Sequence, residues 1–160
     1  MWATGDGEND QWASAGDLPA ADVLRAVVRH GPRFVAVKMT FTNLRRVEPQ
    51  FYFATVVSRR QYDAVFVSAG PRRWRGRHQL VDGNFADVRC PGLSHTLGYD
   101  TEQITILIPR VCIGRPRWVK VGMTNAMFRE TEQNFQEITD NPHSARAQGP
   151  LTRRLPRAAG

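Results

Sequence analysis

The chain has 160 residues, of which 41% are hydrophobic, and a formal net charge of +7. This length fits one domain with a sizeable core, and the hydrophobic content excludes a chain that is disordered throughout. No apolar run approaches the roughly 20 residues that cross a bilayer, so we expect a soluble protein without a membrane span. The first residues lack the basic and apolar regions of a signal peptide, which fits a cytosolic chain or a mature exported one.

The first half of the chain is predicted to form two antiparallel hairpins. Val23–His30 and Phe34–Thr42 alternate in hydrophobicity on either side of a Gly-Pro turn. Phe51–Ser58 and Tyr62–Ser68 are rich in aromatic and β-branched residues and are typical of a second pair of strands. The alternation in the first hairpin and in the later strands predicts one buried face. Its residues are Leu24, Ala26, Val28, Val35, Val37, Met39, Phe41, Ile104, Ile106, Ile108, Val119, Val121 and Met123.

The second half continues the same pattern after a predicted Gly/Pro/Arg loop at Ala69–Arg77. Glu130–Thr139 alone has helical character. The further strands expected are Gln79–Asp82, Phe85–Arg89, Leu93–Tyr99, Thr101–Ile108 and Trp118–Met123. About eight short strands with regular turns predict an all-β fold, an antiparallel, jelly-roll-like β-sandwich. The lack of alternating strands and helices argues against a parallel-sheet nucleotide-binding fold.

The charge distribution suggests three segments. Residues 1–20 form a predicted flexible acidic leader, 21–128 the sandwich, and 129–160 a polar segment with a basic C-terminal tail. Residues 1–22 carry five acids and no Lys or Arg, whereas residues 144–160 carry four Arg and no acid. The excess of Arg over Lys has two explanations, the codon bias of a GC-rich genome and selection for polyanion binding. The tail is expected either to be disordered or to run along the sheet surface with Leu151 and Leu155 as anchors.

The chain has two cysteines, Cys90 and Cys112. An even count favours one disulfide and an oxidising compartment, and the alternative is a pair of buried, reduced thiols in a cytosolic protein. Two cysteines cannot complete a Cys-only zinc site, and no neighbouring spacing resembles one.

The segment from Cys90-Pro91-Gly92-Leu93 to Pro109-Arg110-Val111-Cys112-Ile113-Gly114-Arg115-Pro116, followed by Trp118-Val119-Lys120-Val121-Gly122, resembles a group of secreted proteins from high-GC Gram-positive bacteria. The resemblance covers roughly residues 22–128 and the Gly149–Arg154 ending. It implies a β-sandwich, a Cys90–Cys112 disulfide and export, and no established activity. Some members of that group carry an acidic Asp-x-Asp stretch that suggests calcium binding. This chain has Val57-Ser58-Arg59-Arg60 in that place, with Asp63 as the only nearby acid.

No motif in the sequence points to catalysis or to a cofactor. Ser94 and His95 are adjacent, but neighbours in a strand point to opposite faces, so they predict no nucleophile–base pair. The few acids of the core lie mostly at predicted turns, which argues against paired catalytic carboxylates. Asp6-Gly7-Glu8-Asn9-Asp10 offers oxygen ligands of the kind calcium accepts, although a solvated acidic leader explains it equally well. We therefore assign no catalytic and no metal-binding residue.

Two features could bind a ligand. The first is the Arg72–His78 loop, whose guanidinium groups and interleaved indole suit phosphate or sulfate contacts with stacking; its residues are Arg72, Arg73, Trp74, Arg75, Arg77 and His78. The alternative is a solvated loop with Trp74 packed on the sandwich edge. The second feature is the set of aromatic residues, which could line a sugar-stacking face or simply fill the core: Trp2, Trp12, Phe51, Tyr52, Phe53, Tyr62, Phe66, Trp74 and Trp118.

These observations favour a non-catalytic, secreted, monomeric binding module for glycans or cell-wall polymers. The alternative is a polyanion-binding protein that uses the Arg72–His78 loop, assisted by the basic tail. Fold-level analogy carries most of the first hypothesis, and charge carries the second.

Overall fold

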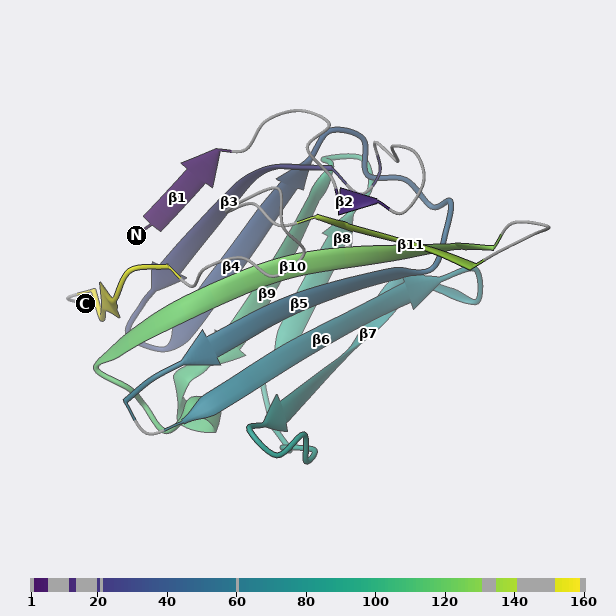
Figure 1. Cartoon of the computed structure of the whole chain (residues 1–160). Coiled ribbons are helices and arrows are strands. Elements are labelled where there is room, and N and C mark those ends of the chain that lie inside the picture. The colour runs from purple at the N-terminus through teal and green to yellow at the C-terminus, as the bar shows by residue number, and fades with distance from the viewer. Residues whose placement is uncertain are drawn as a thin grey trace.

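The computed structural model describes residues 2–5, 12–13, 20, 22–59, 61–130, 135–140 and 152–158. In these residues two antiparallel sheets pack face to face (Figure 1), which confirms the predicted all-β, antiparallel sandwich. The smaller sheet has the order β1 (Trp2–Gly5), β3 (Val23–His30), β4 (Phe34–Phe41), β9 (Gln103–Pro109), β8 (Ser94–Gly98). The larger sheet has the order β2 (Trp12–Ala13), β11 (Phe135–Asp140), β10 (Trp118–Glu130), β5 (Gln50–Val57), β6 (Tyr62–Gly70), β7 (Arg73–Asp82), and β12 (Leu155–Pro156) pairs with β10.

The inward faces of the two sheets form one core. The predicted inward residues of β4, β9 and β10 are buried, as the period-two pattern requires: Val35, Val37, Met39, Phe41, Ile104, Ile106, Ile108, Val119, Val121 and Met123. In β3 the register shifts between Val23 and Arg25, so that Val23, Ala26 and Val28 are buried and Leu24 is only half-buried. This bulge is why the prediction of an inward Leu24 is wrong.

Two segments differ in secondary structure from the prediction. Residues 73–77, predicted as a loop, form the first half of β7, which pairs with β6 from Asp63↔Asp82 to Gly70↔Arg73. The segment at 130–139, predicted as helical, contributes instead the end of β10 and the strand β11, which pairs with it. Arginines are tolerated in β7 because it is the last strand of its sheet, where charged side chains reach water and discourage edge pairing.

The described parts of the predicted leader are strands. β1 pairs with β3 and β2 pairs with β11, each at the outer end of its sheet. The candidate calcium loop Asp6–Asp10 lies outside the described residues.

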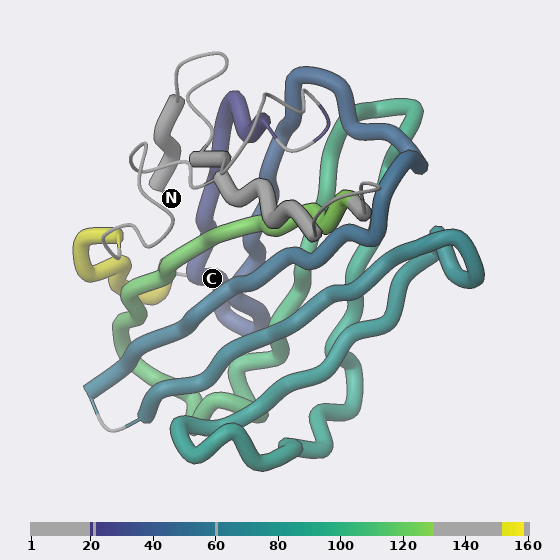
Figure 2. The backbone as a smooth tube through the Cα atoms, turned by 45° about the vertical axis from the view of Figure 1, so that its right-hand side comes forward, coloured from purple at the N-terminus to yellow at the C-terminus, as the bar shows by residue number. Residues whose placement is uncertain are grey.

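The end of the basic tail runs along the sheet surface, one of the two arrangements that the sequence leaves open. Residues 152–158 lie beside β10 (Figure 2), with β12 paired to its first residues and Leu155 buried. Thr152 exchanges hydrogen bonds with Val121, its amide donating to the carbonyl over 2.9 Å and its hydroxyl accepting from the amide over 3.0 Å. Arg154 lies over the Trp118 ring, 4.5 Å from its centroid.

The buried His30 fixes this segment to the smaller sheet. Its Nδ1 lies 3.0 Å from the Leu155 carbonyl oxygen, and its Nε2 accepts a hydrogen bond from Arg110 Nε over 3.0 Å. Because the carbonyl and the guanidinium fill these roles, the ring is neutral with its hydrogen on Nδ1. Burial lowers the pKa of His30; the hydrogen bond to Leu155 opposes this and the Arg110 charge adds to it.

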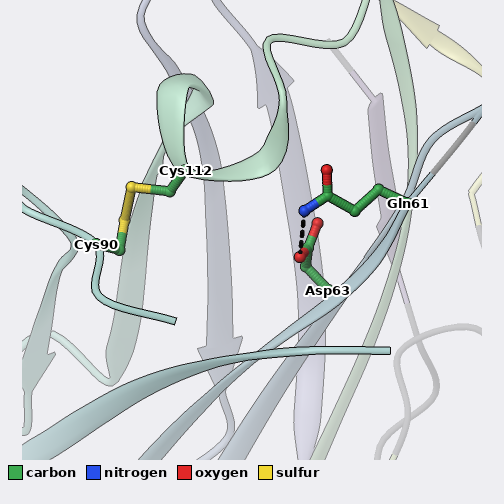
Figure 3. Close-up of a disulfide and its surroundings, with 4 residues drawn as sticks. All are labelled: Gln61, Asp63, Cys90 and Cys112. Carbon is green, nitrogen blue, oxygen red and sulfur yellow. Dashed lines mark hydrogen bonds between the residues drawn. A yellow bond between two sulfur atoms is a disulfide. The ribbon is translucent and has the colours of Figure 1, made fainter. Parts of the chain in front are cut away.

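One disulfide, Cys90–Cys112, joins the segment after β7 to the 3₁₀ helix η1 (Arg110–Ile113), as Figure 3 shows. Near it, Gln61 donates a hydrogen bond of 2.8 Å to the buried Asp63 carboxylate. Burial raises the pKa of Asp63; this hydrogen bond opposes the rise and the facing Asp82 adds to it. Among the described helices, none is long and apolar enough to cross a membrane.

Candidate ligand-binding groove

The outer face of the larger sheet carries a patch of phenylalanine rings. In β5 the side chain of Tyr52 is buried, and the alternation of the strand therefore turns Phe51 and Phe53 to the face away from the core. Phe53 packs edge-to-face on Phe66 of β6, and Phe51 packs the same way on Phe128 of β10, each pair with centroids 5.1 Å apart. All four rings are half-buried, so part of each remains open to solvent.

Two adjoining hollows continue this patch across β6 and β7. The first has a volume of about 690 Å³ and the second of about 580 Å³, and both are lined by Ser68 and Arg77. Phe66 lines the first hollow and Phe51 the second, so ring surface is available in both. Because Ser68 faces Arg77 in the register of β6 and β7, the shared residues join the two hollows into one groove.

The walls of the groove are basic. Arg72 and Arg73 line the second hollow, Arg89 lines the first, and Arg77 lies between them. All four side chains are exposed, and none forms an ion pair within the described ranges, where Arg129 pairs with Glu48 instead. Guanidinium groups held this way can donate paired hydrogen bonds to a carboxylate, sulfate or phosphate.

The wall beyond β7 is the segment that the disulfide secures. The Val88 amide donates to the Leu80 carbonyl over 2.8 Å, and Val81 forms an isolated bridge with Asp87. These contacts make residues 86–88 follow β7 without forming the separate strand predicted at Phe85–Arg89. Asp87, the one acid of the groove, accepts a hydrogen bond from Gln79. The groove therefore keeps an excess of positive charge.

The structure divides the predicted Arg72–His78 site between two locations. Arg72, Arg73, Arg77 and His78 line the groove. Trp74 instead packs edge-to-face on Tyr99, with centroids 6.2 Å apart. Tyr99 follows β8 and its hydroxyl donates to the Trp74 carbonyl over 3.1 Å. This is the sandwich-edge position that the sequence offers as the alternative for Trp74.

His78 contacts a histidine from the other sheet. The Nδ1 atoms of His78 and His95 are 2.8 Å apart, and His95 Nε2 lies 2.8 Å from the Arg75 carbonyl oxygen. Burial, followed by the charge of His95, lowers the pKa of His78.

Sequence reasoning finds the arginines of the groove and names Phe51 and Phe66 among the possible stacking rings, but it leaves their outward direction open. The run Phe51-Tyr52-Phe53 is the signal that could have revealed it, because three consecutive aromatic residues in a strand must place rings on both faces of a sheet. The meeting of His78 and His95 has no comparable signal, since neither the spacing nor the local pattern links the two strands.

Fold and groove define a two-sheet, all-β protein with one disulfide and an open face that is both aromatic and basic. No family model matches the chain, and comparison with the curated proteins and the solved structures finds no match. The resemblance to secreted Gram-positive proteins is thus confirmed for the sandwich and the Cys90–Cys112 bond and stays a prediction for the family.

The disulfide is consistent with an oxidising compartment. Asp63, the only acid near the stretch that is acidic in some of the resembling proteins, is buried. Within the described ranges, no group of three or more His, Cys, Asp or Glu side chains could hold a calcium ion.

Proposed function

We propose that the protein is an exported, non-catalytic module that binds acidic polysaccharides in the groove on the outer face of the larger sheet. The observation that carries the proposal is the continuity of the two hollows through Ser68 and Arg77, with phenylalanine rings in the floor and arginines in the walls. Such a groove offers two kinds of contact to one polymer. Ring faces pack on the apolar side of a sugar, and guanidinium groups pair with carboxylate or sulfate substituents.

The shape of the groove also fits a polymer better than a small molecule. Small-molecule sites usually enclose most of the ligand surface, whereas this groove lies along the open face of a sheet. An extended chain can pass over Phe51, Ser68 and Phe66 and contact arginines at successive positions along its length. Each contact displaces a counterion, so binding is expected to weaken steeply as salt is added.

The test is the binding of a fluorescent dextran sulfate at low and at moderate salt, with uncharged dextran of the same length alongside. The groove variant is Arg73→Ser/Arg77→Ser. The matched control is Arg115→Ser/Arg117→Ser, which removes the same charge from exposed positions outside the groove. We expect salt-sensitive binding by the wild type and the control. In the groove variant, the slope of the logarithm of the binding constant against the logarithm of the salt concentration should fall by about one for each arginine removed.

Two results would overturn the proposal. Equal losses in the groove and control variants would show that only net charge attracts the polymer. Equal binding of sulfated and uncharged dextran, unaffected by salt, would assign the groove to neutral glycans. A Phe66→Leu variant then tests the floor, because it keeps apolar bulk at the site and removes the flat ring.

A further inference from the structure

The two sheets meet at their open edge through a pair of imidazole rings. His78 extends from β7 of the larger sheet and His95 from β8 of the smaller one. Their centroids are 5.0 Å apart with the rings nearly perpendicular, at 81°, and their Nδ1 atoms are separated by 2.8 Å. The contact is open to solvent, so an ion can reach both nitrogens.

The backbone of β7 holds the His95 ring in this position. Nε2 of His95 lies 2.8 Å from the Arg75 carbonyl, and because a carbonyl only accepts, the ring hydrogen is on Nε2. The Nδ1 lone pair of His95 is therefore turned toward His78. A Cβ added at Gly76, which has a φ of +77°, would lie 2.7 Å from this Nε2, so the ring occupies space that only glycine leaves free.

This arrangement shares one feature with histidine pairs that bind a metal ion. A metal-binding histidine usually donates its other ring N–H to a carbonyl or a carboxylate, which fixes the tautomer and the direction of the lone pair, as Arg75 does for His95. Two nitrogens that each lie about 2.0 Å from one ion are about 2.8 Å apart at a right angle and about 3.3 Å apart at the tetrahedral angle. The observed 2.8 Å is also the length of an N–H···N hydrogen bond, and the centroid separation of 5.0 Å shows that the two nitrogens point at each other. Each ring therefore has to turn before both lone pairs reach one ion.

We propose that His78 and His95 form a surface site for a divalent transition-metal ion, Cu(II) in the first place and Ni(II) more weakly. Imidazole nitrogens suit both ions, and Cu(II) stands highest in the affinity order of the divalent series. When the ion binds, Nδ1 of His78 gives its hydrogen to water while Nε2 of the same ring takes one from water, so both rings stay neutral and each Nδ1 donates its lone pair to the metal. The proposal does not rest on the polysaccharide function.

The surroundings set the character of the site. In the described part of the chain no third His, Cys, Asp or Glu completes a group, so water fills the remaining positions of the ion. Arg75 and Arg77, on either side of Gly76, are exposed and cationic, which lowers the affinity for any cation. The expected site is therefore an exchangeable one.

The experiment is a titration of the purified protein with Cu(II), followed by calorimetry and by electron paramagnetic resonance. We expect one ion per chain with a nitrogen hyperfine pattern from two imidazoles. His78→Gln and His95→Gln each remove one ligand and should abolish this pattern. Gly76→Ala keeps both imidazoles, displaces His95, and should weaken binding about 10-fold. His143→Gln is the matched control and should leave binding unchanged.

Thermal unfolding of each variant shows that the fold is retained, and the two glutamine variants keep the test decisive if Gly76→Ala unfolds. Cu(II) binding that survives both glutamine variants would overturn the proposal. So would a spectrum with a single nitrogen, or no stoichiometric binding by the wild type, since the pair would then be a hydrogen bond between the sheets and nothing more.

Discussion

The disulfide offers the clearest quantitative prediction about this fold. The perturbation is the double variant Cys90→Ser/Cys112→Ser, which removes the bond and leaves side chains of nearly the same size. Both sulfur atoms lie at the edge of the core rather than inside it, so the substitution exposes little apolar surface. Its main effect is therefore expected on the unfolded chain, which gains the freedom that the bond denies it.

The magnitude follows from the length of chain that the bond closes. The two cysteines are 22 positions apart, and the loop-closure relation for that length gives a loss of about 3 kcal/mol in the free energy of unfolding. A domain of this size converts each kcal/mol into roughly 2–4 °C, so the melting temperature should fall by roughly 6–12 °C. Small domains are commonly stable by about 5–15 kcal/mol, so the variant should still fold.

Urea unfolding of the wild type, the double variant and the wild type kept in reductant measures this effect. Reduced wild type and double variant should agree, and reductant should not change the variant. A loss below about 1 kcal/mol would refute the reasoning, because a loop of this length cannot be closed at so little cost in entropy. Hydrogen exchange adds a local readout: the Val88 amide, which donates to Leu80 in the groove wall, should exchange faster without the bond.

Three more predictions concern buried groups. Because burial lowers the pKa of His30, the imidazole takes up a proton more readily in the unfolded chain than in the folded one. The free energy of unfolding of the wild type should therefore decrease as pH falls below about 6.5. Urea unfolding across this pH range should show a smaller decrease for His30→Gln. Because burial raises the pKa of Asp63, Asp63→Asn should be the more stable protein at pH 7, in urea or heat, with the gain vanishing below about pH 4. Ile106→Ala in β9 should cost about 2–5 kcal/mol in urea unfolding, since the side chain is fully buried.

The inward faces of the central strands are predictable from sequence because burial imposes the period-two pattern directly. Val37, Met39 and Phe41 alternate with Lys38, Thr40 and Thr42, and the structure buries all three apolar residues. The pattern fails where something else decides the conformation. At Val23–Arg25 a bulge adds a residue and reverses the alternation. No local sequence pattern predicts this bulge.

The course of β7 shows why the candidate site is only partly predictable. Its first half combines arginines with a glycine, a composition typical of loops, yet β6 supplies hydrogen-bond partners that extend the strand. The register of β6 and β7 shifts between Ser68 and Gly70, which face Arg77 and Arg73. Both arginines line the second hollow, and the Trp74 ring packs on Tyr99. Charge alone predicted a basic site, but its pairing with the Phe51 and Phe66 rings depends on the register of three strands.

Both proposed sites lie along β7, and the position of that strand explains why. β7 ends the larger sheet, and its contacts with the smaller sheet are made by side chains, among them His78 with His95 and Trp74 with Tyr99. Because only side chains cover this edge, polar groups along β7 stay accessible that hydrogen bonding to a further strand would bury. The segment held by Cys90 and His78 of the histidine pair both line the first hollow, so the two proposed sites adjoin. We therefore expect variants in β7 to affect binding far more than equally exposed variants in β4, whose hydrogen-bonding edges are both paired.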